Sequence, residues 1–283
     1  IAVESHVMER VRAAGVPTPV VHAADAGRRE VAFAWQVLEH VPHPDLNRHF
    51  KEGRLDLERT APLIGACIAR WQAMMPAGFG PFDIAALRAG RGLGGYHHEY
   101  ADYFHIRLDE HLDFLAGKEM ISSPQTVEIR REIEQHRKLL RAPTPDARGC
   151  LVHKDLALWN ILGNPGQITA FIDWDDAVGG DPMDDISLLA CFHDGTAVKQ
   201  AFEGFASIRP FPPEHCRRFW LHLLRNLIFK AVIRVGAGYF DRTDGFFLIG
   251  AGDSGAGLRR FTLARIDAAL QGLRRGADPF DLS

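Results

Sequence analysis

The sequence predicts an α+β fold in which helices dominate and strands occupy two short sections. Apolar residues recur at helical spacing over most of the chain after residue 55. Apolar, β-branched runs that favour strands occur near 31–38 and within 150–173. With 283 residues, of which 46% are hydrophobic and 24% charged, the chain is a folded globular protein and not a disordered, collagen-like or coiled-coil one.

The opening section is predicted to contain one helix and part of a sheet. Valines at helical spacing define an amphipathic helix over residues 2–14, and Gly15 stands where it stops. After a turn, residues 31–38 read as a strand, which Pro42 ends. A linker then leads into the larger part of the chain.

The remainder is mainly helical around one short β-rich island. The predicted helices span 57–75, 94–116, 124–141, 184–193, 196–207, 213–236 and 256–273. The island consists of strands at 150–153 and 168–173, joined by a loop with an Asn-Pro-Gly turn at 164–166. This loop carries an unusual number of acidic residues.

Charge, cysteines and hydropathy indicate which binding partners and which cellular compartment to expect. The 33 Lys and Arg against 36 Asp and Glu leave a net charge of −3, too balanced to indicate nucleic acid or an anionic membrane as partner. The four cysteines lie far apart without a CxxC pair, which is typical of a reducing compartment. No apolar run is long enough to cross a bilayer. We therefore expect a cytoplasmic protein.

Three oxygen-bearing side chains follow the strand ends of the island. Asp155 and Asn160 follow the first strand, and Asp173 closes the second, so a hairpin-like return of the chain can bring them together. Carboxylate and amide oxygens suit magnesium better than zinc. A carboxylate that does not bind the metal can orient a hydroxyl and accept its proton. Downstream, Asp181 before Pro182 reads as a helix cap.

These residues resemble the catalytic loop of the protein-kinase superfamily. His153, Asp155 and Asn160 match its spacing, and Asp173 stands where the superfamily has its metal-binding aspartate. Trp174 after that aspartate, and the Gly-Asp-Pro at 180–182, are similar to the aminoglycoside phosphotransferase and choline kinase branch. The resemblance implies a protein-kinase-like two-lobe fold with a mainly α-helical C-terminal lobe.

The resemblance also implies roles for the island. Asp155 becomes the catalytic base, and Asn160 and Asp173 hold Mg²⁺ at the phosphates of ATP or GTP. His153 would brace the loop, or simply be a satisfied buried histidine. Asp185 would tie its helix to the loop, or be an ordinary first-turn acid.

Further residues are assigned by the same resemblance. The carbonyl of Glu39 and the N–H of Val41 are expected to contact adenine, and Glu4 resembles the glutamate that pairs with a nucleotide-binding lysine, with an exposed helix acid as its alternative. At Lys154 protein kinases carry Arg and many small-molecule kinases Gly. Of its two readings, a phosphate contact and a solvated lysine, we favour the second.

The small lobe of the family is only partly matched. Its glycine-rich loop and lysine should precede the first helix, where this sequence has no residues, and none of the six lysines lies before Lys51. We expect an N-terminally truncated small lobe at 1–41, a linker to about 46, and a C-terminal lobe over 42–283. The implied function is a small-molecule kinase. The alternatives are a catalytically inactive, kinase-like binding or regulatory protein and an unrelated metal-dependent hydrolase.

The acceptor remains open. A small hydroxylated substrate is expected, and acids in and near the island could favour a cationic one such as an aminoglycoside or be merely solvated. These acids are Asp175, Asp176, Asp184 and Glu203. Aromatic residues of the 213–240 segment are expected mostly in the core, with some able to contact substrate. They are Phe219, Trp220, Phe229, Tyr239 and Phe240.

Overall fold

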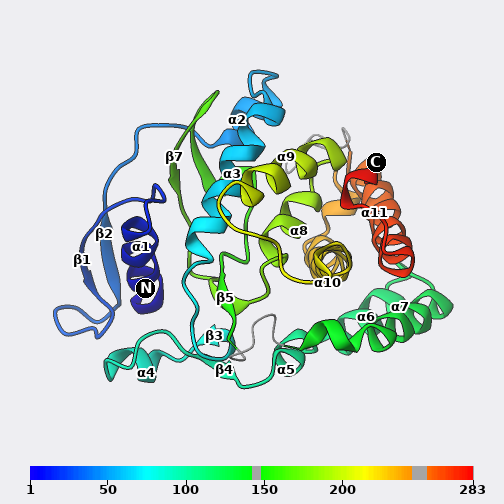
Figure 1. Cartoon of the computed structure of the whole chain (residues 1–283), viewed down its shortest axis with the longest axis horizontal. Helices are drawn as coiled ribbons and strands as arrows, with labels where there is room; N and C mark the ends of the chain where they lie inside the picture. Colours follow the sequence, from blue (N-terminus) through cyan, green and yellow to red (C-terminus); the bar gives the residue numbers. More distant parts are fainter. Residues whose placement is uncertain (142–147, 244–253, 283) are drawn as a thin grey trace.

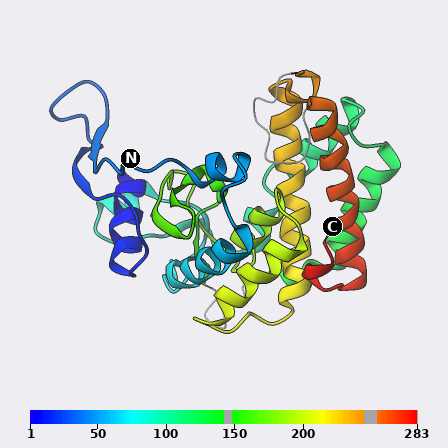
Figure 2. The same cartoon turned by 90° about the horizontal axis from the view of Figure 1, so that it is seen from above.

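The chain folds into a small mixed section at its start and a larger, mainly helical body, seen at opposite ends of the molecule in Figures 1 and 2. The computed structural model describes residues 1–141, 148–243 and 254–282. The opening section consists of α1 (Ala2–Ala13), β1 (Val21–Asp25) and β2 (Trp35–Leu38). The predicted first helix is confirmed, and the predicted strand begins only at Trp35.

Helix α1 forms because its valines face the interior. Val7, Met8 and Val11 are buried, and Gly15 follows the helix with a φ of 77°, a conformation that favours glycine. Strands β1 and β2 pair antiparallel, with Val21 opposite Leu38. This section stands beside the island and so borders the site described below.

The body is built largely from helices, with short 3-10 turns such as η2 (Leu158–Asn160) between them. Its helices are α2 (Leu46–Lys51), α3 (Leu57–Trp71), α4 (Ile84–Arg88), α5 (Tyr100–Phe104), α6 (Leu108–Gly117), α7 (Ser123–Gln135), α8 (Asp184–Ala190), α9 (Gly195–Ala206), α10 (His215–Gly236) and α11 (Gly255–Arg275). The helices predicted at 57–75, 184–193, 196–207, 213–236 and 256–273 are confirmed with small shifts of their ends. That predicted at 124–141 ends as α7 at Gln135 and continues as a 3-10 turn over Arg137–Leu140.

The strands of the island belong to two small antiparallel sheets. Strands β3 (Phe79–Phe82), β4 (Gly95–His97), β5 (Cys150–Val152) and β8 (Val178–Gly180) form one sheet in the order β4-β3-β8-β5. Strands β6 (Ile161–Asn164) and β7 (Gln167–Phe171) form a hairpin, closed by the turn expected at 164–166. Both predicted strands are therefore present, as β5 and β7.

The single helix predicted over 94–116 is wrong. Gly95 instead lies in β4 opposite Phe82, so close that a Cβ atom on it would stand 2.3 Å from the carbonyl oxygen of Phe79. Arg107 has a φ of 55° and separates α5 from α6. Pairing with β3 and one left-handed residue therefore divide the helical pattern into β4, α5 and α6.

The core of the body lies around α3, α9 and α10. Helices α3 and α9 approach so closely that a Cβ atom on Gly65 would stand 1.9 Å from the carbonyl oxygen of Ala201. At the end of α3, the fully buried ring of Trp71 packs edge-on against Phe171 and Trp174, with ring centroids 5.1 and 5.3 Å away. The end of α3 thus packs against the last residue of the β6–β7 hairpin and against the segment that follows it.

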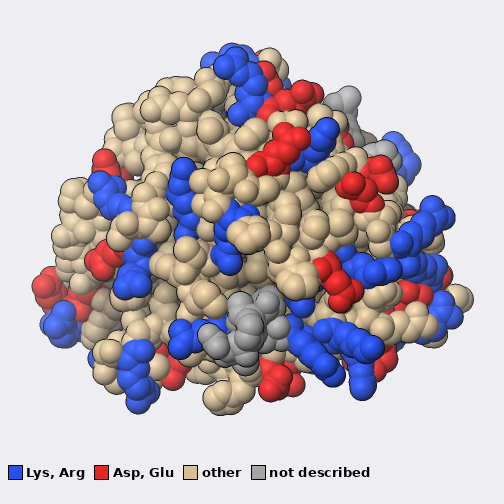
Figure 3. All heavy atoms as spheres, viewed as in Figure 1, with Lys and Arg blue, Asp and Glu red and all other residues tan. Residues whose placement is uncertain are grey.

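Acidic and basic side chains are interspersed over the face shown in Figure 3, in keeping with the small net charge. Among the described residues, no helix combines the length and apolar character needed to span a membrane.

Candidate active site

The loop after β5 and the exit of the β6–β7 hairpin meet through backbone contacts. Asn160, at the end of η2, accepts a hydrogen bond from the N–H of Ile172 through its carbonyl oxygen, at 3.0 Å. His153 Nε2 donates to the carbonyl oxygen of Ile172 at 2.9 Å. The structure thus brings His153, Asn160 and the residue before Asp173 together.

Asp155 is held by two donors. The side-chain amide of Asn160 donates to its Oδ2 at 3.0 Å and to its carbonyl oxygen at 2.8 Å. Lys230 of α10 donates to Oδ1 at 2.6 Å. The Asp155 side chain keeps 24% of its exposure, so it is oriented by the protein while one side stays open to a ligand.

His153 is buried in its neutral form. Nε2 carries the proton given to Ile172, so Nδ1 is free to accept the N–H of Asp155 at 3.3 Å. Burial lowers the pKa of His153 to about 4, although the Ile172 carbonyl and the Asp155 charge oppose it. Protonation of Nδ1 would break the contact to Asp155.

Because of His153, the free energy of unfolding is expected to decrease as the pH is lowered. The pKa of His153 is about 4 in the folded chain and 6.5 without burial, so between these values the unfolded chain binds more protons and stability falls as pH falls, by up to about 3 kcal/mol. Urea unfolding between pH 7.5 and 5 should show a shallower pH dependence for His153→Gln than for the wild type. The exposed His98→Gln should keep the wild-type slope, and parallel curves for wild type and His153→Gln would contradict the assignment.

Asp185 joins α8 to the loop and to α3. Its carboxylate accepts the N–H groups of His153 and Lys154, at 3.1 and 3.2 Å, and the indole N–H of Trp71 at 2.9 Å. Burial raises the pKa of Asp185 to about 7, while the N–H donors favour the ionised form. This carboxylate fixes the backbone on either side of the turn that leads to Asp155.

Lys154 is not solvated, and the interpretation favoured from the sequence is wrong. Its ammonium group donates to both carboxylate oxygens of Asp184 at 2.9 Å and to Asn226 Oδ1 at 2.8 Å. Burial would raise the pKa of Asp184, but the Lys154 charge and further partners lower it to about 2. The backbone at Lys154 has a φ of 71°, a conformation that favours glycine. The lysine is thus a largely buried cation that is paired within the protein and borders the cavity described below.

Helix α10 contributes a stripe of polar residues at four-residue spacing, which we call the α10 stripe: Arg218, His222, Asn226 and Lys230. Arg218 pairs with the fully buried Asp181, which also accepts the N–H of Met183 near the start of α8. His222 Nε2 lies 3.5 Å from Asp181. Lys230 reaches Asp155 at the other end. These residues were not predicted from the sequence, although polar positions at every fourth residue of an apolar helix indicate a polar face.

The Asp173 side chain is exposed and lies beside that of Asp175, with which it shares a hydrogen bond. Its φ of 66° turns the chain sharply after β7. Partial burial and the neighbouring carboxylates of Asp175, Asp155 and Asp176 raise the pKa of Asp173 to about 6. A cation would relieve this repulsion.

A magnesium ion fits the side chains present. The Asn160 amide donates its hydrogens to Asp155, which leaves its oxygen for a metal, and the exposed carboxylate of Asp173 follows two residues after the end of β7. Within the described part of the chain, no cluster of three or more His, Cys, Asp or Glu forms a closed metal cage. Magnesium needs only one or two protein oxygens when phosphate oxygens and water supply the rest.

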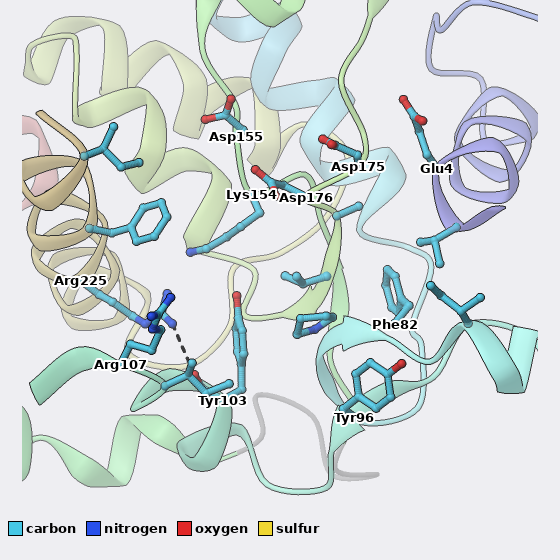
Figure 4. Close-up of a pocket in the computed structure, with 18 of the residues that line it drawn as sticks. Glu4, Phe82, Tyr96, Tyr103, Arg107, Lys154, Asp155, Asp175, Asp176 and Arg225 are labelled. Carbon is cyan, nitrogen blue, oxygen red and sulfur yellow. Dashed lines mark hydrogen bonds between the residues drawn. The ribbon is translucent and has the colours of Figure 1, made fainter. Parts of the chain in front are cut away.

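A cavity of about 680 Å³ opens onto Asp155. Figure 4 shows Asp155, Asp175 and Asp176 on one side, Glu4 from α1 on another, and Arg107 and Arg225 at the end away from Glu4. Glu4 accepts a hydrogen bond from Gln36 of β2 at 2.7 Å. Asp184 and Glu203, considered with these acids from the sequence, lie outside the cavity lining.

Glu39 and Val41 line a second, smaller cavity of about 250 Å³ with Thr18 and Thr169. The Glu39 carboxylate accepts the N–H of Val20 at 3.0 Å. Among the described residues, the Glu39 carbonyl and the Val41 N–H form no hydrogen bond with each other or with a neighbour. These two residues are therefore apart from the Asp155 cavity, and their backbone groups are open to a ligand.

Of the aromatic residues noted in the 213–240 segment, Phe219 and Trp220 are buried in the core. Phe229 is 44% exposed and lines the cavity. Core packing is thus confirmed for Phe219 and Trp220, and contact of Phe229 with substrate stays a prediction.

Comparisons with known proteins place the chain. Residues 1–220 match the model of the phosphotransferase enzyme family. A search of curated proteins gives no significant match. The fold is similar to that of a thermostable mutant of aminoglycoside phosphotransferase APH(4)-Ia, solved with AMP-PNP and hygromycin B, at 17% identity, a TM-score of 0.63, and coverage of 95% of this chain and 81% of that one.

Two further solved structures share the fold. A choline/ethanolamine kinase family protein from Mesorhizobium loti has 16% identity, a TM-score of 0.58 and coverage of 99% and 84%. An aminoglycoside 2′-phosphotransferase IIIa mutant in complex with GDP has 16% identity, a TM-score of 0.57 and coverage of 97% and 80%. The α+β, kinase-like fold expected from the resemblance is confirmed, and the chain belongs to the phosphotransferase enzyme family.

Proposed function

We propose that this phosphotransferase moves the γ-phosphate of ATP or GTP to a hydroxyl group of a small molecule. The observation that carries the proposal is Asp155, an oriented carboxylate that opens onto a cavity large enough for a small molecule. The similar structures that hold AMP-PNP or GDP support a nucleotide as phosphate donor.

In the proposed reaction, Asp155 orients the acceptor hydroxyl and takes up its proton. The acceptor oxygen forms a bond to the γ-phosphorus as the bond from that phosphorus to the β-γ bridging oxygen breaks, which releases ADP or GDP. Asn160 and Asp173 would hold magnesium, which when bound neutralises charge on the phosphates. Lys230 and Asn160 keep Asp155 in one orientation.

We extend the proposal to the contacts predicted at Glu39, Val41 and Glu4. We propose that adenine or guanine binds at the Glu39 carbonyl and the Val41 N–H, which line the smaller cavity. Glu4 borders the Asp155 cavity and would face the phosphates. In this proposal residues 1–41 act as the small lobe, the linker runs to about 46, and residues 42–283 form the large lobe.

Acceptor-dependent ADP or GDP release tests the function. A panel of hydroxylated acceptors should stimulate release with the wild type only when Mg²⁺ is present. Nucleotide binding without stimulation by any acceptor would favour the inactive, kinase-like binding protein. Release of product without nucleotide would favour a hydrolase.

Substitution of Asp173 is expected to weaken the binding of Mg²⁺. Asp173→Asn removes one charge from the site, so the Mg²⁺ concentration for half-maximal rate should rise at least about 10-fold. Asp241→Asn, a change on the 3-10 turn after α10, serves as control. An unchanged Mg²⁺ requirement in Asp173→Asn would rule out this residue as ligand.

A further inference from the structure

Arg225 presents a guanidinium group to the Asp155 cavity from α10. Its Nε donates to the carbonyl oxygen of Phe104 at 2.8 Å, and Nη2 donates to that of Tyr103 at 3.4 Å. The same group lies over the rings of Tyr103 and Phe104, 5.0 and 5.3 Å from their centroids. Neutral groups thus fix its position and leave its charge uncompensated.

Two other cations of the cavity are neutralised within the protein, since Lys154 pairs with Asp184 and Lys230 with Asp155. Arg107 lies 3.3 Å from Glu110, but both side chains are exposed, so this surface pair is weak. Throughout the residues that the structure describes, no carboxylate forms an ion pair with Arg225. A half-buried charge without a counterion is costly unless a ligand supplies one.

Arg107 and Arg225 both act on His111 of α6, which lines the same cavity. Burial lowers the pKa of His111, and the charges of Arg107 and Arg225 lower it further. Figure 4 shows Arg107 and Arg225 together at one end of the cavity, whereas the acids that lie beside the proposed magnesium site stand apart from them.

Part of the cavity wall is apolar and open. Residues that are usually buried are exposed here, which is typical of a ligand-binding surface. They are Ile84, Tyr96, Ile106, Phe229 and Ile233, each 38% exposed or more. An acceptor that covers them needs an apolar body.

We infer that the acceptor is a hydroxylated small molecule with an apolar body and an anionic group, a carboxylate or phosphate, which Arg225 binds with Arg107 beside it. The inference rests on the proposed function for the identity of this ligand as the phosphate acceptor. Arg225 is the primary contact because the protein holds it in place, and its planar group suits two-point binding of an anion. A polycationic acceptor would face an uncompensated positive charge.

Matched acceptors test the charge. The probes are 3-phenyllactate, its methyl ester, and the amino alcohol phenylalaninol, which share an aromatic body and a hydroxyl group. Binding is measured by calorimetry with Mg²⁺ and AMP-PNP present, and turnover by ADP release. The acid is expected to bind about 10- to 100-fold more tightly than the ester, and the amino alcohol more weakly than either.

Variants assign the preference to Arg225. Arg225→Gln should remove the preference for the acid and raise its KM about 10- to 100-fold, with kcat within about 3-fold of the wild type. Arg209→Gln is the matched control, because Arg209 also donates to a backbone carbonyl, that of Gln72, and lies over an aromatic ring, but outside this cavity. If Arg225→Gln does not fold, Arg107→Gln, a change at an exposed residue, tests the anion site instead. It is expected to weaken binding of the acid about 3-fold.

The outcomes separate the two proposals. An ester or amino alcohol bound as tightly as the acid, or a preference for the acid that survives in the variants, overturns the anion site. If ADP release occurs only with neutral or cationic acceptors, the phosphotransferase function stands and the anion site fails. If the acid is preferred in binding but no acceptor is phosphorylated, the anion site stands and the proposed function fails.

Discussion

Asp155→Asn is expected to lower kcat about 10²- to 10⁴-fold, the usual contribution of a positioned proton acceptor. Asparagine keeps an oxygen for Lys230, which now donates to Oδ1 at 2.6 Å, but it has no carboxylate to take the proton of the acceptor hydroxyl. The loss should fall on kcat and leave nucleotide affinity within about 3-fold of the wild type, since the nucleotide is not bound through this carboxylate. ADP release at saturating Mg²⁺ and acceptor measures it.

The control for Asp155→Asn is Glu203→Gln, a change at an exposed acid of α9 that does not line the cavity. It carries the same loss of one charge and should retain full activity. A kcat for Asp155→Asn within about tenfold of the wild type would remove Asp155 from the reaction and leave it a structural partner of Asn160 and Lys230.

Asp184→Ala is expected to destabilise the fold by about 3–5 kcal/mol, because it leaves Lys154 as a largely buried cation without its counterion. Lys154 Nζ donates to both Asp184 oxygens at 2.9 Å, and Asn226 would remain its only side-chain acceptor among the described residues. The free energy of unfolding in urea measures the loss. Activity should fall at the same time, because Lys154 precedes Asp155 in the chain.

A double variant separates the ion pair from the space it fills. With Lys154→Met and Asp184→Leu together, no charge is left unpaired, and stability should be nearer the wild type than in Asp184→Ala. If the destabilisation of the double variant equals the sum of those of Lys154→Met and Asp184→Leu, the loss of stability does not come from an unpaired charge.

The sequence predicted the parts of the site that are local in the chain. His153, Asp155, Asn160 and Asp173 lie within one loop-and-hairpin unit, so strand ends and spacing were enough to bring them together. The helices that carry strong apolar periodicity, such as α3 and α9, were predicted for the same reason. The catalytic and metal-binding roles assigned to these residues stay predictions, as do the roles of Glu39, Val41 and Glu4.

What the sequence could not predict depends on contacts between distant segments. Strand β3 contains Pro81, and β8 contains two glycines, so neither has strand propensity, and only pairing with a neighbour makes them strands. Lys230 and Arg225 reach the cavity from a helix that follows the loop by more than fifty residues. Lys154 looked like a surface lysine because Asp184 and Asn226, which bury its charge, are distant in the chain.

Because of the four-residue spacing of the α10 stripe, the orientation of Asp155 depends on the number of residues in this helix. Each step of four residues turns about 40° around the helix axis, so Arg218 and Lys230 contact Asp181 and Asp155 only while the number of residues between them is kept. One residue inserted between them would rotate Lys230 by about 100° away from Asp155 while Arg218 stayed in place. Length variation in α10 is therefore expected before Arg218 or after Lys230, and a catalytically neutral insertion between them would be the exception.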